Sequence, residues 1–481
     1  MKKLIIILAL ILLPSFTWAY DVVIDGIYYN LVKETKEAEV THGNNKYTGS
    51  VVIPSKVTYD EKEYSVISIG DSAFFFCHEL TSITIPQSII NIGNRAFYHC
   101  NGLESVMIPN SITKIGDAAF FSCASLSSVN LPNSILTIGK YAFAYCITLS
   151  SIVIPVNLTS ISEGTYCGCS SLSSVVIPEG INSIGAKTFS ECKSLTTFDI
   201  PEGVATIDNE AFSICVNLDS VAIPNSVKYI GDFAFIDTKL NSIYIPKGVE
   251  HIGEKVFIGS PLSSIIVDRN NKIFDSRDNC NAIIETSTNK LIIGCKCTKI
   301  PQSITSIGKN AFWHCSGLTS IDIPEGVDSI GDHAFYRCYD LSSIVFPSTL
   351  TSIGESAFCN CHGLTSVIIP NSVIFIGEYA FAHCSFVSVE ISNSITSIEP
   401  NTFAWCQSLT SVVIPSGVKT IGNYAFYNCY KLTSVEIPES VTTIGEKAFF
   451  HCSRLPFILI PKSVTTIGKD AFKECYTLRF Y

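Results

Sequence analysis

A regular internal repeat is the feature that most constrains the fold of this chain. Cysteine recurs with a constant 23-residue spacing in two series, and one step of the second series is shorter by a single position. The first series is Cys77, Cys100, Cys123, Cys146, Cys169, Cys192 and Cys215, and the second is Cys315, Cys338, Cys361, Cys384, Cys406, Cys429, Cys452 and Cys475. Proline follows the same register. Independent globular domains do not share a register, so the repeat predicts a solenoid of stacked units.

Each repeat predicts two short strands and one short helical turn. In the repeat from Leu103 to Cys123, apolar and polar residues alternate up to Pro109, which predicts a strand that ends at that proline. A second short stretch ends at Gly116, where glycine permits a positive φ. Asp117 is placed to cap a helical turn that carries an Ala-Phe pair and a cysteine inward.

One repeat alone cannot bury its apolar side chains, because both of its faces along the stacking axis are open. Stacked neighbours close those faces, so stability is a sum of nearest-neighbour contributions. The isoleucines at the Ile-Gly position number about 17, nine from Ile69 to Ile252 and eight from Ile307 to Ile467. The predicted fold is therefore a β-rich solenoid of about 17 stacked units.

Two segments depart from the repeat and predict a cap and an insertion. Residues 20–65 alternate apolar and polar residues without the 23-residue register, which predicts an N-terminal β-hairpin cap. Within residues 268–300, the stretches 281–285 and 290–294 predict an inserted β-hairpin. The repeat arrays are then residues 66–267 and 301–481.

The first 19 residues are typical of an export signal. Two lysines precede an apolar run from Leu4 to Leu13, which is too short to span a membrane. Small residues precede a predicted cleavage site after Ala19. No later segment approaches 18 uninterrupted apolar residues. The mature protein is expected to be secreted, periplasmic or at the cell surface, without a transmembrane segment.

The repeat resembles the BspA-like leucine-rich repeat family. The motif that carries the resemblance runs from Ala311-Phe312-Trp313-His314-Cys315 through Leu318, Ile321 and Ile323-Pro324 to Ile330-Gly331. The resemblance covers almost all of the mature chain. It implies a leucine-rich repeat fold in an exported bacterial surface protein, with adhesion to host matrix proteins or to other bacteria. It supplies no site residues.

The cysteines have two interpretations. An exported chain with an even number of cysteines often forms disulfides. Parallel side chains in stacked repeats, however, keep their Cβ atoms farther apart than a disulfide prefers, which favours a ladder of buried thiols. Cys280, Cys295 and Cys297 lie outside the register, and a bridge from Cys280 to Cys295 or Cys297 across the inserted hairpin is a hypothesis that remains open.

The chain shows no signature of an enzyme, a cofactor site or a nucleic-acid site. Histidine adjoins cysteine at several repeats, as in His314-Cys315, but adjacent residues point apart and do not converge on a metal. No H-E-x-x-H, G-x-S-x-G or phosphate-loop motif is present. The net charge of −10 and the lack of basic clusters argue against nucleic acid.

Two surface features are candidates for partner binding. One is the outward position of the first strand, which is apolar at Met107, Val153, Val176, Tyr244, Val345, Ile368, Val413 and Leu459 and lies beside a row of serines. The other is a set of aromatic residues just after the Ala-Phe pair: Tyr98, Phe121, Tyr145, Trp313, Tyr336, Trp405, Tyr427 and Phe450. Aromatic side chains are enriched at protein interfaces and also close the edges of cores, and both interpretations stay open.

The sequence therefore predicts an exported, non-enzymatic repeat protein that binds an extracellular macromolecular partner through an extended face. The aromatic residues are the predicted partner-binding residues. A carbohydrate-binding module that uses the same rings, or a structural component of the cell envelope, are the alternatives.

Overall fold

The computed structural model describes residues 20–456 and 458–475, and the predicted export signal at residues 1–19 lies outside the described residues. The chain forms two compact units. Unit 1 comprises the described residues up to Leu158 together with Ser162–Val176, and unit 2 comprises Thr159–Ile161 and the described residues from Ile177 onward. Both units are β-solenoids of stacked coils, and together they hold the 17 Ile-Gly repeats that the sequence predicts, with the insertion between the ninth and the tenth.

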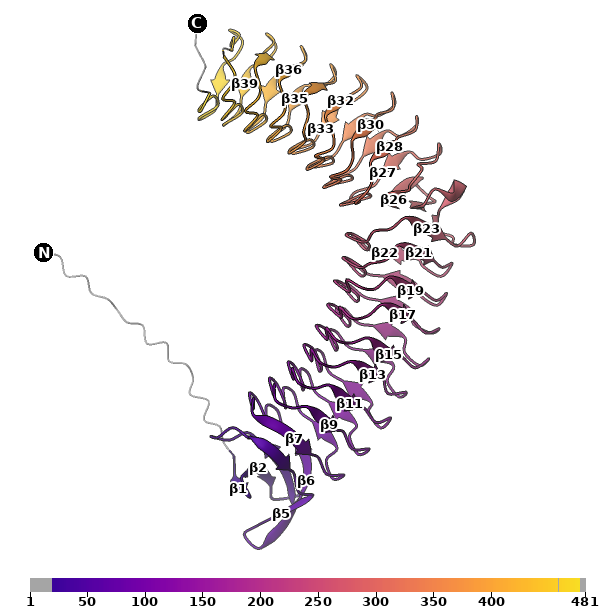
Figure 1. Ribbon diagram of the computed structural model, residues 1–481, viewed down its shortest axis with the longest axis vertical. Helices are drawn as coiled ribbons and strands as arrows, with labels where there is room; N and C mark the ends of the chain where they lie inside the picture. The colour runs from indigo at the N-terminus through magenta and orange to yellow at the C-terminus, as the bar shows by residue number, and fades with distance from the viewer. Residues whose placement is uncertain (1–19, 457, 476–481) are drawn as a thin grey trace, which may run out of the picture. The chain divides into compact units, whose positions relative to one another are not determined.

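A cap of six strands begins unit 1 and is coloured indigo in Figure 1. The strands are β1 (Val22–Ile24), β2 (Ile27–Val32), β3 (Glu37–Thr41), β4 (Gly49–Val52), β5 (Lys56–Tyr59) and β6 (Lys62–Ile69). Strands β1, β2 and β3 form an antiparallel meander, and β5 and β6 form a hairpin. Parallel pairing of β3 with β6 joins the two parts. The cap is thus more elaborate than the single hairpin predicted from the sequence.

Each regular coil contributes a first strand and a two-residue second strand to two separate rows. The first strands of unit 1 are β4, β7 (Leu80–Thr84), β9 (Ser105–Met107), β11 (Ser128–Asn130), β13 (Ser151–Val153) and β15 (Ser174–Val176). Its second strands are the end of β6, then β8 (Asn91–Ile92), β10 (Lys114–Ile115) and β12 (Thr137–Ile138). Equivalent residues pair in parallel, as Val106 pairs with Val129. The cap prolongs both rows, since β4 pairs with β7 and β6 with β8.

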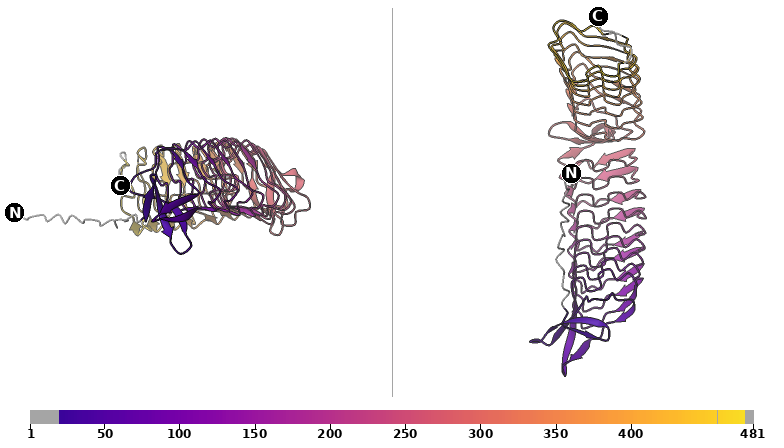
Figure 2. Two further views of the ribbon diagram at one scale, coloured as in Figure 1. Left: turned by 90° about the horizontal axis from the view of Figure 1, so that it is seen from below. Right: turned by 90° about the vertical axis from the view of Figure 1, so that its left-hand side faces the viewer.

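Unit 2 repeats the same two rows. Its first strands are β17 (Thr197–Asp199), β19 (Ser220–Ala222), β21 (Ser242–Ile245), β23 (Ser264–Val267), β28 (Ser320–Asp322), β30 (Ser343–Val345), β32 (Ser366–Ile368), β34 (Ser388–Glu390), β36 (Ser411–Val413) and β38 (Ser434–Glu436). Its second strands are β14 (Ser160–Ile161), β16 (Ser183–Ile184), β18 (Thr206–Ile207), β20 (Tyr229–Ile230), β22 (His251–Ile252), β27 (Ser306–Ile307), β29 (Ser329–Ile330), β31 (Ser352–Ile353), β33 (Phe375–Ile376), β35 (Ser397–Ile398), β37 (Thr420–Ile421), β39 (Thr443–Ile444) and β40 (Thr466–Ile467). Figure 2 shows strands of successive coils side by side within each unit.

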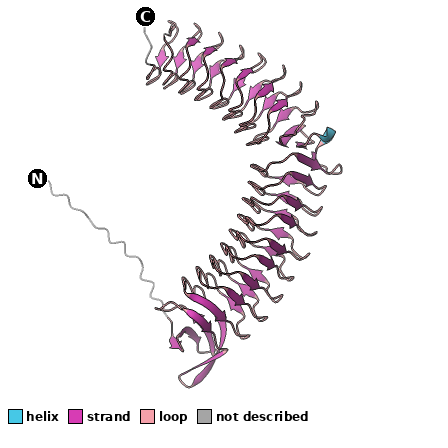
Figure 3. Cartoon of the chain, in the orientation of Figure 1, coloured by secondary structure: helices cyan, strands magenta, loops and turns pink. Residues whose placement is uncertain are grey.

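The helical turn predicted in each repeat does not form. The only helix among the described residues is the 3-10 helix η1 (Arg277–Asn279) in the insertion, which is cyan in Figure 3. In the segment Asp117–Cys123, Ala118 and Ser122 adopt left-handed φ values of 51° and 57°. A single helical turn would leave most of its amide groups without partners. The segment instead forms consecutive tight turns, and we call it and its equivalents the turn segments.

Hydrogen bonds between turn segments explain why the tight turns are favoured. The N–H groups of alternate residues in one turn segment donate to carbonyl groups of the next, as Phe97 N–H donates to Ala119 and Phe120 N–H to Ala142. A peptide group whose carbonyl accepts a bond from the preceding coil donates its N–H to the following coil. Successive regular coils therefore share three columns of hydrogen-bonded amides, which we call the amide columns; in unit 2 the columns are interrupted at the insertion. Their N–H groups all point toward the following coil.

The polar residue after the Ile-Gly pair bonds to the next coil and does not cap a helix. Asp117 Oδ1 accepts the backbone N–H of Lys140 at 2.8 Å, and Asn94 Oδ1 accepts that of Asp117 at 2.8 Å. The sequence predicts that Gly116 is needed for a positive φ, but φ at Gly116 is not positive. A Cβ atom at Gly116 would lie 2.6 Å from the backbone nitrogen of Asn94. Close approach of consecutive coils therefore requires the glycine.

The core of most coils holds one phenylalanine and one cysteine from the turn segment; Tyr166 replaces the phenylalanine in one coil, and Thr238 and Ser260 replace the cysteine in two. In unit 1 the rings of Phe74, Phe97, Phe120 and Phe143 stack face to face at centroid distances of 4.9, 4.9 and 5.2 Å. The Cys123 thiol donates to the carbonyl oxygen of Phe97 at 3.1 Å, and this bond recurs along the ladder of cysteines. Burial raises the pKa of the Cys123 thiol well above its usual value of 9.0.

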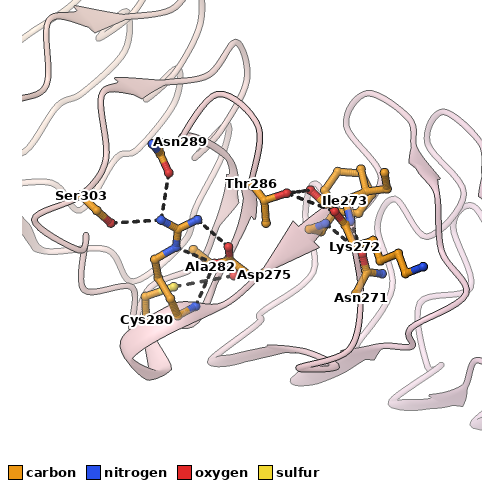
Figure 4. A network of polar contacts seen from close by, with 11 residues as sticks. Asn271, Lys272, Ile273, Asp275, Cys280, Ala282, Thr286, Asn289 and Ser303 are labelled. Atoms are coloured by element: carbon orange, nitrogen blue, oxygen red, sulfur yellow. Dashed lines mark hydrogen bonds and ion pairs between the residues drawn. The ribbon is translucent and has the colours of Figure 1, made fainter.

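The inserted β-hairpin predicted in the middle of the chain is confirmed. It comprises β25 (Ala282–Glu285) and β26 (Lys290–Gly294), which are antiparallel, and β24 (Phe274–Asp275) pairs with β25. Strand β26 pairs in parallel with β27 and so continues the second row. The Arg277 guanidinium donates to Asp275, to Asn289 at 2.9 Å and to Ser303 at 3.3 Å, which fastens the hairpin to the following coil (Figure 4).

Candidate functional site

The outward position of the first strand places one exposed side chain per coil on a row in each unit, and in unit 2 the insertion interrupts this row between β23 and β28. We call this row, together with the serines two residues earlier, the strand face. Its outward residues in unit 1 are Val52, Thr84, Met107, Asn130, Val153 and Val176, and in unit 2 Asp199, Ala222, Tyr244, Ile266, Asp322, Val345, Ile368, Glu390, Val413, Glu436 and Leu459. Alternation along a strand turns the neighbouring residues inward, so Val106 is buried between the exposed Ser105 and Met107.

Many outward side chains of the strand face are apolar and unusually exposed. Met107 and Leu459 have 76% of their surface exposed, and Val345 has 69%. Val153 pairs directly with Val176, and Tyr244 pairs with Ile266. Exposed apolar side chains are therefore adjacent across strands. Contiguous apolar surface of this kind is typical of interaction sites.

The charges on the strand face are mostly negative. Among the outward positions named above the ionisable residues are Asp199, Asp322, Glu390 and Glu436, all in unit 2, whereas the equivalent position beside the insertion, two residues before Pro301, holds the exposed Lys299. The hydroxyl of Tyr244 donates to Asp268 at 2.6 Å, and this bond lowers the pKa of the Asp268 carboxyl. The strand face of unit 2 thus combines apolar side chains with carboxylates, which favours a partner that is apolar and basic.

The predicted aromatic residues lie on the turn segments but in two different positions. Tyr98, Phe121, Trp313, Tyr336, Tyr427 and Phe450 directly follow the core phenylalanine. Tyr145 and Trp405 stand one residue later, because Ala144 and Ala404 occupy the first position. The second position has a left-handed backbone, with φ of 57° at Tyr145 and 63° at Trp405. The eight residues predicted as one set therefore occupy two positions with different backbone conformations.

Rings at the first position pack on one another and are half-buried. In unit 1, Tyr98 stacks on Phe121 at 4.9 Å, and in unit 2, Tyr427 stacks on Phe450 at 5.1 Å and Trp313 contacts Tyr336 at 4.4 Å. Tyr145 and Trp405, at the second position, are more exposed, at 38% and 39%. Most of the aromatic set therefore closes the edge of the core, and two of its rings present a face to solvent.

The cysteines are thiols in the structure, and the histidines next to some of them in the sequence are a separate feature. All 20 cysteines are free thiols in the structure, including Cys280, Cys295 and Cys297. The Cys295 thiol donates to the Asn281 carbonyl at 3.3 Å. The hypothesis of a bridge at these three residues stays a prediction, which a thiol titration tests. Among the described residues no group of three or more His, Cys, Asp or Glu side chains is arranged to hold a metal ion.

Parallel strands stacked in register over a core that recurs once in every coil define a leucine-rich repeat solenoid. A family model described as the BspA-type leucine-rich repeat region matches residues 55–173, 159–284, 289–396 and 374–481. The chain belongs to the BspA-type leucine-rich repeat family. No helix in the part of the chain that the structure describes is long and apolar enough to cross a membrane.

Solved structures of bacterial leucine-rich repeat proteins resemble this chain. A leucine-rich repeat protein from Bacteroides ovatus is 29% identical, with a TM-score of 0.51, and the match covers 96% of this chain and 99% of that one. A leucine-rich cell surface protein from Faecalibacterium prausnitzii is 26% identical over 93% and 94% of the two chains, with a TM-score of 0.38. The pneumococcal vaccine antigen PcpA is 17% identical over 93% of each chain, with a TM-score of 0.35. No curated protein sequence matches the chain.

Proposed function

We propose that this chain is an exported, non-enzymatic repeat protein that binds a macromolecular partner, with the strand face as the contact surface. The partner is a protein of the host matrix or of another bacterial surface, so the role is adhesion. The observation that carries the proposal is the row of exposed apolar side chains, such as Met107, Val345 and Leu459, on rigid strands. The family, whose members are repeat proteins, supports a binding role in general terms.

The proposed mechanism is contact at many points. Each coil offers one outward side chain, and parallel pairing fixes the spacing of these side chains within a unit. A rigid surface loses little conformational entropy when it binds, so weak contacts add up to a useful affinity. The carboxylates of unit 2 would increase the association rate of a basic partner and make it depend on salt.

The experiment compares three variants of the full chain for binding to immobilised host matrix extract and to whole bacterial cells. The strand-face variant carries Val345→Ser, Ile368→Ser and Val413→Ser. The aromatic variant carries Trp313→Ala, Tyr336→Ala, Trp405→Ala and Tyr427→Ala. The control is Ile374→Ser, because Ile374 is 65% exposed, as Ile368 is, but lies beside the second row of strands.

We expect the strand-face variant to bind at least about tenfold more weakly, since each buried branched side chain contributes on the order of 1 kcal/mol or more. The control should bind as the native chain does. Native affinity in the strand-face variant, with its circular dichroism spectrum unchanged, would refute the strand face as the contact surface.

Carbohydrate binding through the aromatic residues is the second candidate. It is favoured by the exposed ring of Trp405, which stacks on His383 at 5.5 Å and an interplanar angle of 7°. Sugars stack on such ring faces. A loss of binding confined to the aromatic variant, together with hits on a glycan array, would support this candidate in place of the strand face.

A further inference from the structure

One coil of unit 2 lacks its turn segment. Leu291 occupies the place of the Ile-Gly isoleucine, because Lys290–Leu291 pairs with Ser306–Ile307 and the carbonyl of Leu291 accepts the N–H of Gly308. Ten positions separate Leu291 from Pro301, whereas 17 separate Ile307 from Pro324 in the next coil. The seven missing residues are the length of the segment from Asp117 to Cys123 in a regular coil.

The missing turn segment leaves a cavity of about 430 Å³ in unit 2. The turn segments Gly253–Ser260 and Gly308–Ser316 form its two walls, and the hairpin strand β26 contributes Ile292, Ile293 and Gly294. We call this cavity the slot. Its volume lies in the range of small-ligand sites.

The main-chain groups of the two walls that face the slot are those that would form hydrogen bonds with the missing turn segment. In the preceding coil, the N–H groups of Phe233, Phe235 and Asp237 donate to the next coil. Their equivalents at Lys255, Phe257 and Gly259 have no acceptor among the described residues. On the opposite wall, the carbonyl groups of Lys309 and Trp313 likewise receive no donor in the described part of the chain, and that of Ala311 accepts from Gly294.

The amide columns give the slot a direction. They end at the first wall with three N–H groups and begin again at the second wall with carbonyl groups. Aligned amide dipoles place partial positive charge where N–H groups end and partial negative charge where carbonyl groups end. A ligand with hydrogen-bond acceptors along one edge and donors along the other matches both walls, and this is the pattern of a peptide main chain.

The core rings end at the two walls of the slot and are already covered there. The stack of core rings stops at Phe257, which stacks on Phe235 at 5.7 Å, and resumes at Phe312, which stacks on Phe335 at 4.9 Å. Cys315 is half-buried, whereas the other cysteines of the ladder are buried. Phe312 is 1% exposed and lies against Gly294 of β26, and Phe257 is 6% exposed, so a ligand in the slot meets the main chain of the walls and not the faces of these rings.

Three side-chain contacts already connect the walls. Lys309 Nζ lies 3.2 Å from Glu254 Oε1, Asn310 Nδ2 donates to Glu254 Oε2 at 3.3 Å, and Lys255 Nζ lies 3.9 Å from the centroid of the Trp313 ring. Lys309, Glu254 and Lys255 are long, flexible side chains. Exposed ion pairs contribute little stability, so these contacts yield to a ligand at small cost.

We propose that the slot binds a peptide segment of another protein, which lies between the two walls and pairs with their main-chain groups. The carbonyl groups of the peptide accept the N–H groups of Lys255, Phe257 and Gly259. Its N–H groups donate to Lys309 and Trp313. This site is separate from the strand face and does not depend on the adhesion role.

The test uses the full chain and an acetylated, amidated peptide with the sequence of residues 117–122, Asp-Ala-Ala-Phe-Phe-Ser, which fills this place in a regular coil. We expect sub-millimolar binding by isothermal titration calorimetry. The same peptide with its main-chain amides N-methylated should bind about tenfold more weakly or worse, because it can no longer donate to the carbonyl groups of the second wall.

Labelling of two cysteines locates the bound peptide. Cys315 lines the slot, and the exposed Cys297 does not. We expect saturating peptide to slow the alkylation of Cys315 at least threefold, as measured by mass spectrometry, and to leave Cys297 unchanged. No binding at about 2 mM peptide, or binding that leaves the Cys315 rate unchanged, would overturn the proposal.

Two variants separate the slot from the strand face. Cys315→Phe fills the slot and should abolish peptide binding while matrix binding persists. The strand-face variant Val345→Ser, Ile368→Ser and Val413→Ser should bind the peptide normally. If Cys315→Phe does not fold, alkylation of Cys315 in the Cys297→Ser protein provides the blocked slot. Undiminished peptide binding to the blocked slot would contradict the proposed location.

Discussion

Replacing a ring in the middle of the phenylalanine stack should cost more than replacing the ring at the slot. Phe335 is fully buried and stacks on Phe312 at 4.9 Å and on Phe358 at 5.0 Å. Phe257 is 6% exposed and has one stacked neighbour, Phe235, at 5.7 Å. The two residues are otherwise matched, since each is the core phenylalanine of its turn segment.

A buried Phe→Ala change removes about 3–5 kcal/mol of stability, from lost apolar burial and the cavity that remains. Each stacked pair adds about 0.5–1.5 kcal/mol beyond the area that it buries. Phe335→Ala loses two pairs and Phe257→Ala loses one, so we expect Phe335→Ala to cost about 1 kcal/mol more. Because coils interact with their nearest neighbours, the loss should be confined to the flanking coils.

Hydrogen exchange measured by mass spectrometry, coil by coil, tests both the size and the location of the effect. Protection in Phe335→Ala should fall most in the turn segments that contain Phe312, Phe335 and Phe358 and remain native in unit 1. An equal or larger cost for Phe257→Ala would refute the contribution of stacking. A loss of protection spread evenly over both units would refute nearest-neighbour stability.

Three further predictions concern the cysteines and the polar residues after the Ile-Gly pairs. Above about pH 9 the thiols of the unfolded chain ionise, whereas buried thiols such as Cys123, whose pKa is raised, stay protonated in the folded chain. The unfolded state then binds fewer protons than the folded state. Each such thiol therefore lowers the free energy of unfolding by about 1.4 kcal/mol per pH unit. Circular dichroism should therefore show a steep alkaline transition that begins near pH 9 and moves to higher pH in a Cys123→Ala, Cys146→Ala variant; an unmoved midpoint would contradict this. Asn94→Ala removes the acceptor of the Asp117 N–H and should lower the stability measured by thermal unfolding by about 1 kcal/mol. The control Lys114→Ala, at an exposed position of β10, should leave the stability unchanged. Equal effects of the two changes would contradict a stabilising role for the bonds that the polar residues after the Ile-Gly pairs make to the next coil. Thiol titration of the unfolded, unreduced protein should return 20 free thiols if Cys280, Cys295 and Cys297 form no bridge, and 18 if two of them do.

Most of the fold follows from the sequence, because each coil repeats the same physical demands. The isoleucine before each glycine, the proline after the first strand and the cysteine register predict the stack, the two strand rows and the buried thiols. The inserted hairpin is also predictable, since its two apolar stretches flank a short polar loop.

The turn segments could not be predicted from the residues they contain. Left-handed positions such as Ala118 and Ser122 hold no glycine, and the amide columns that stabilise them are bonds between repeats. Most single repeats therefore carry no sign of them; one exception is the repeat with Gly164 and Gly168, which hold both left-handed positions at φ 61° and 72°. The shortened coil, in contrast, could have been found by counting, because the distance from Leu291 to Pro301 departs from every regular repeat.

The aromatic set was only partly predictable for the same reason. Trp405 follows Phe403-Ala404, so its place one position beyond that of Trp313 could be counted from the sequence. The exposure of the Trp405 ring could not be predicted, because it depends on which side chain of the adjacent coil lies next to it.

The amide columns determine where such a protein can change its length during evolution or engineering. A residue added or lost within a turn segment would shift donors against acceptors and break all three columns at once. The coils that are shorter than the others by a single position have lost it elsewhere, in the corner after the cysteine position, where Thr238-Lys239-Leu240, Ser260-Pro261-Leu262 and Cys384-Ser385-Phe386 replace the usual four residues. Loops, tags or epitopes inserted at these corners should be tolerated, whereas the same insertions next to an Ala-Phe pair should divide the solenoid in two.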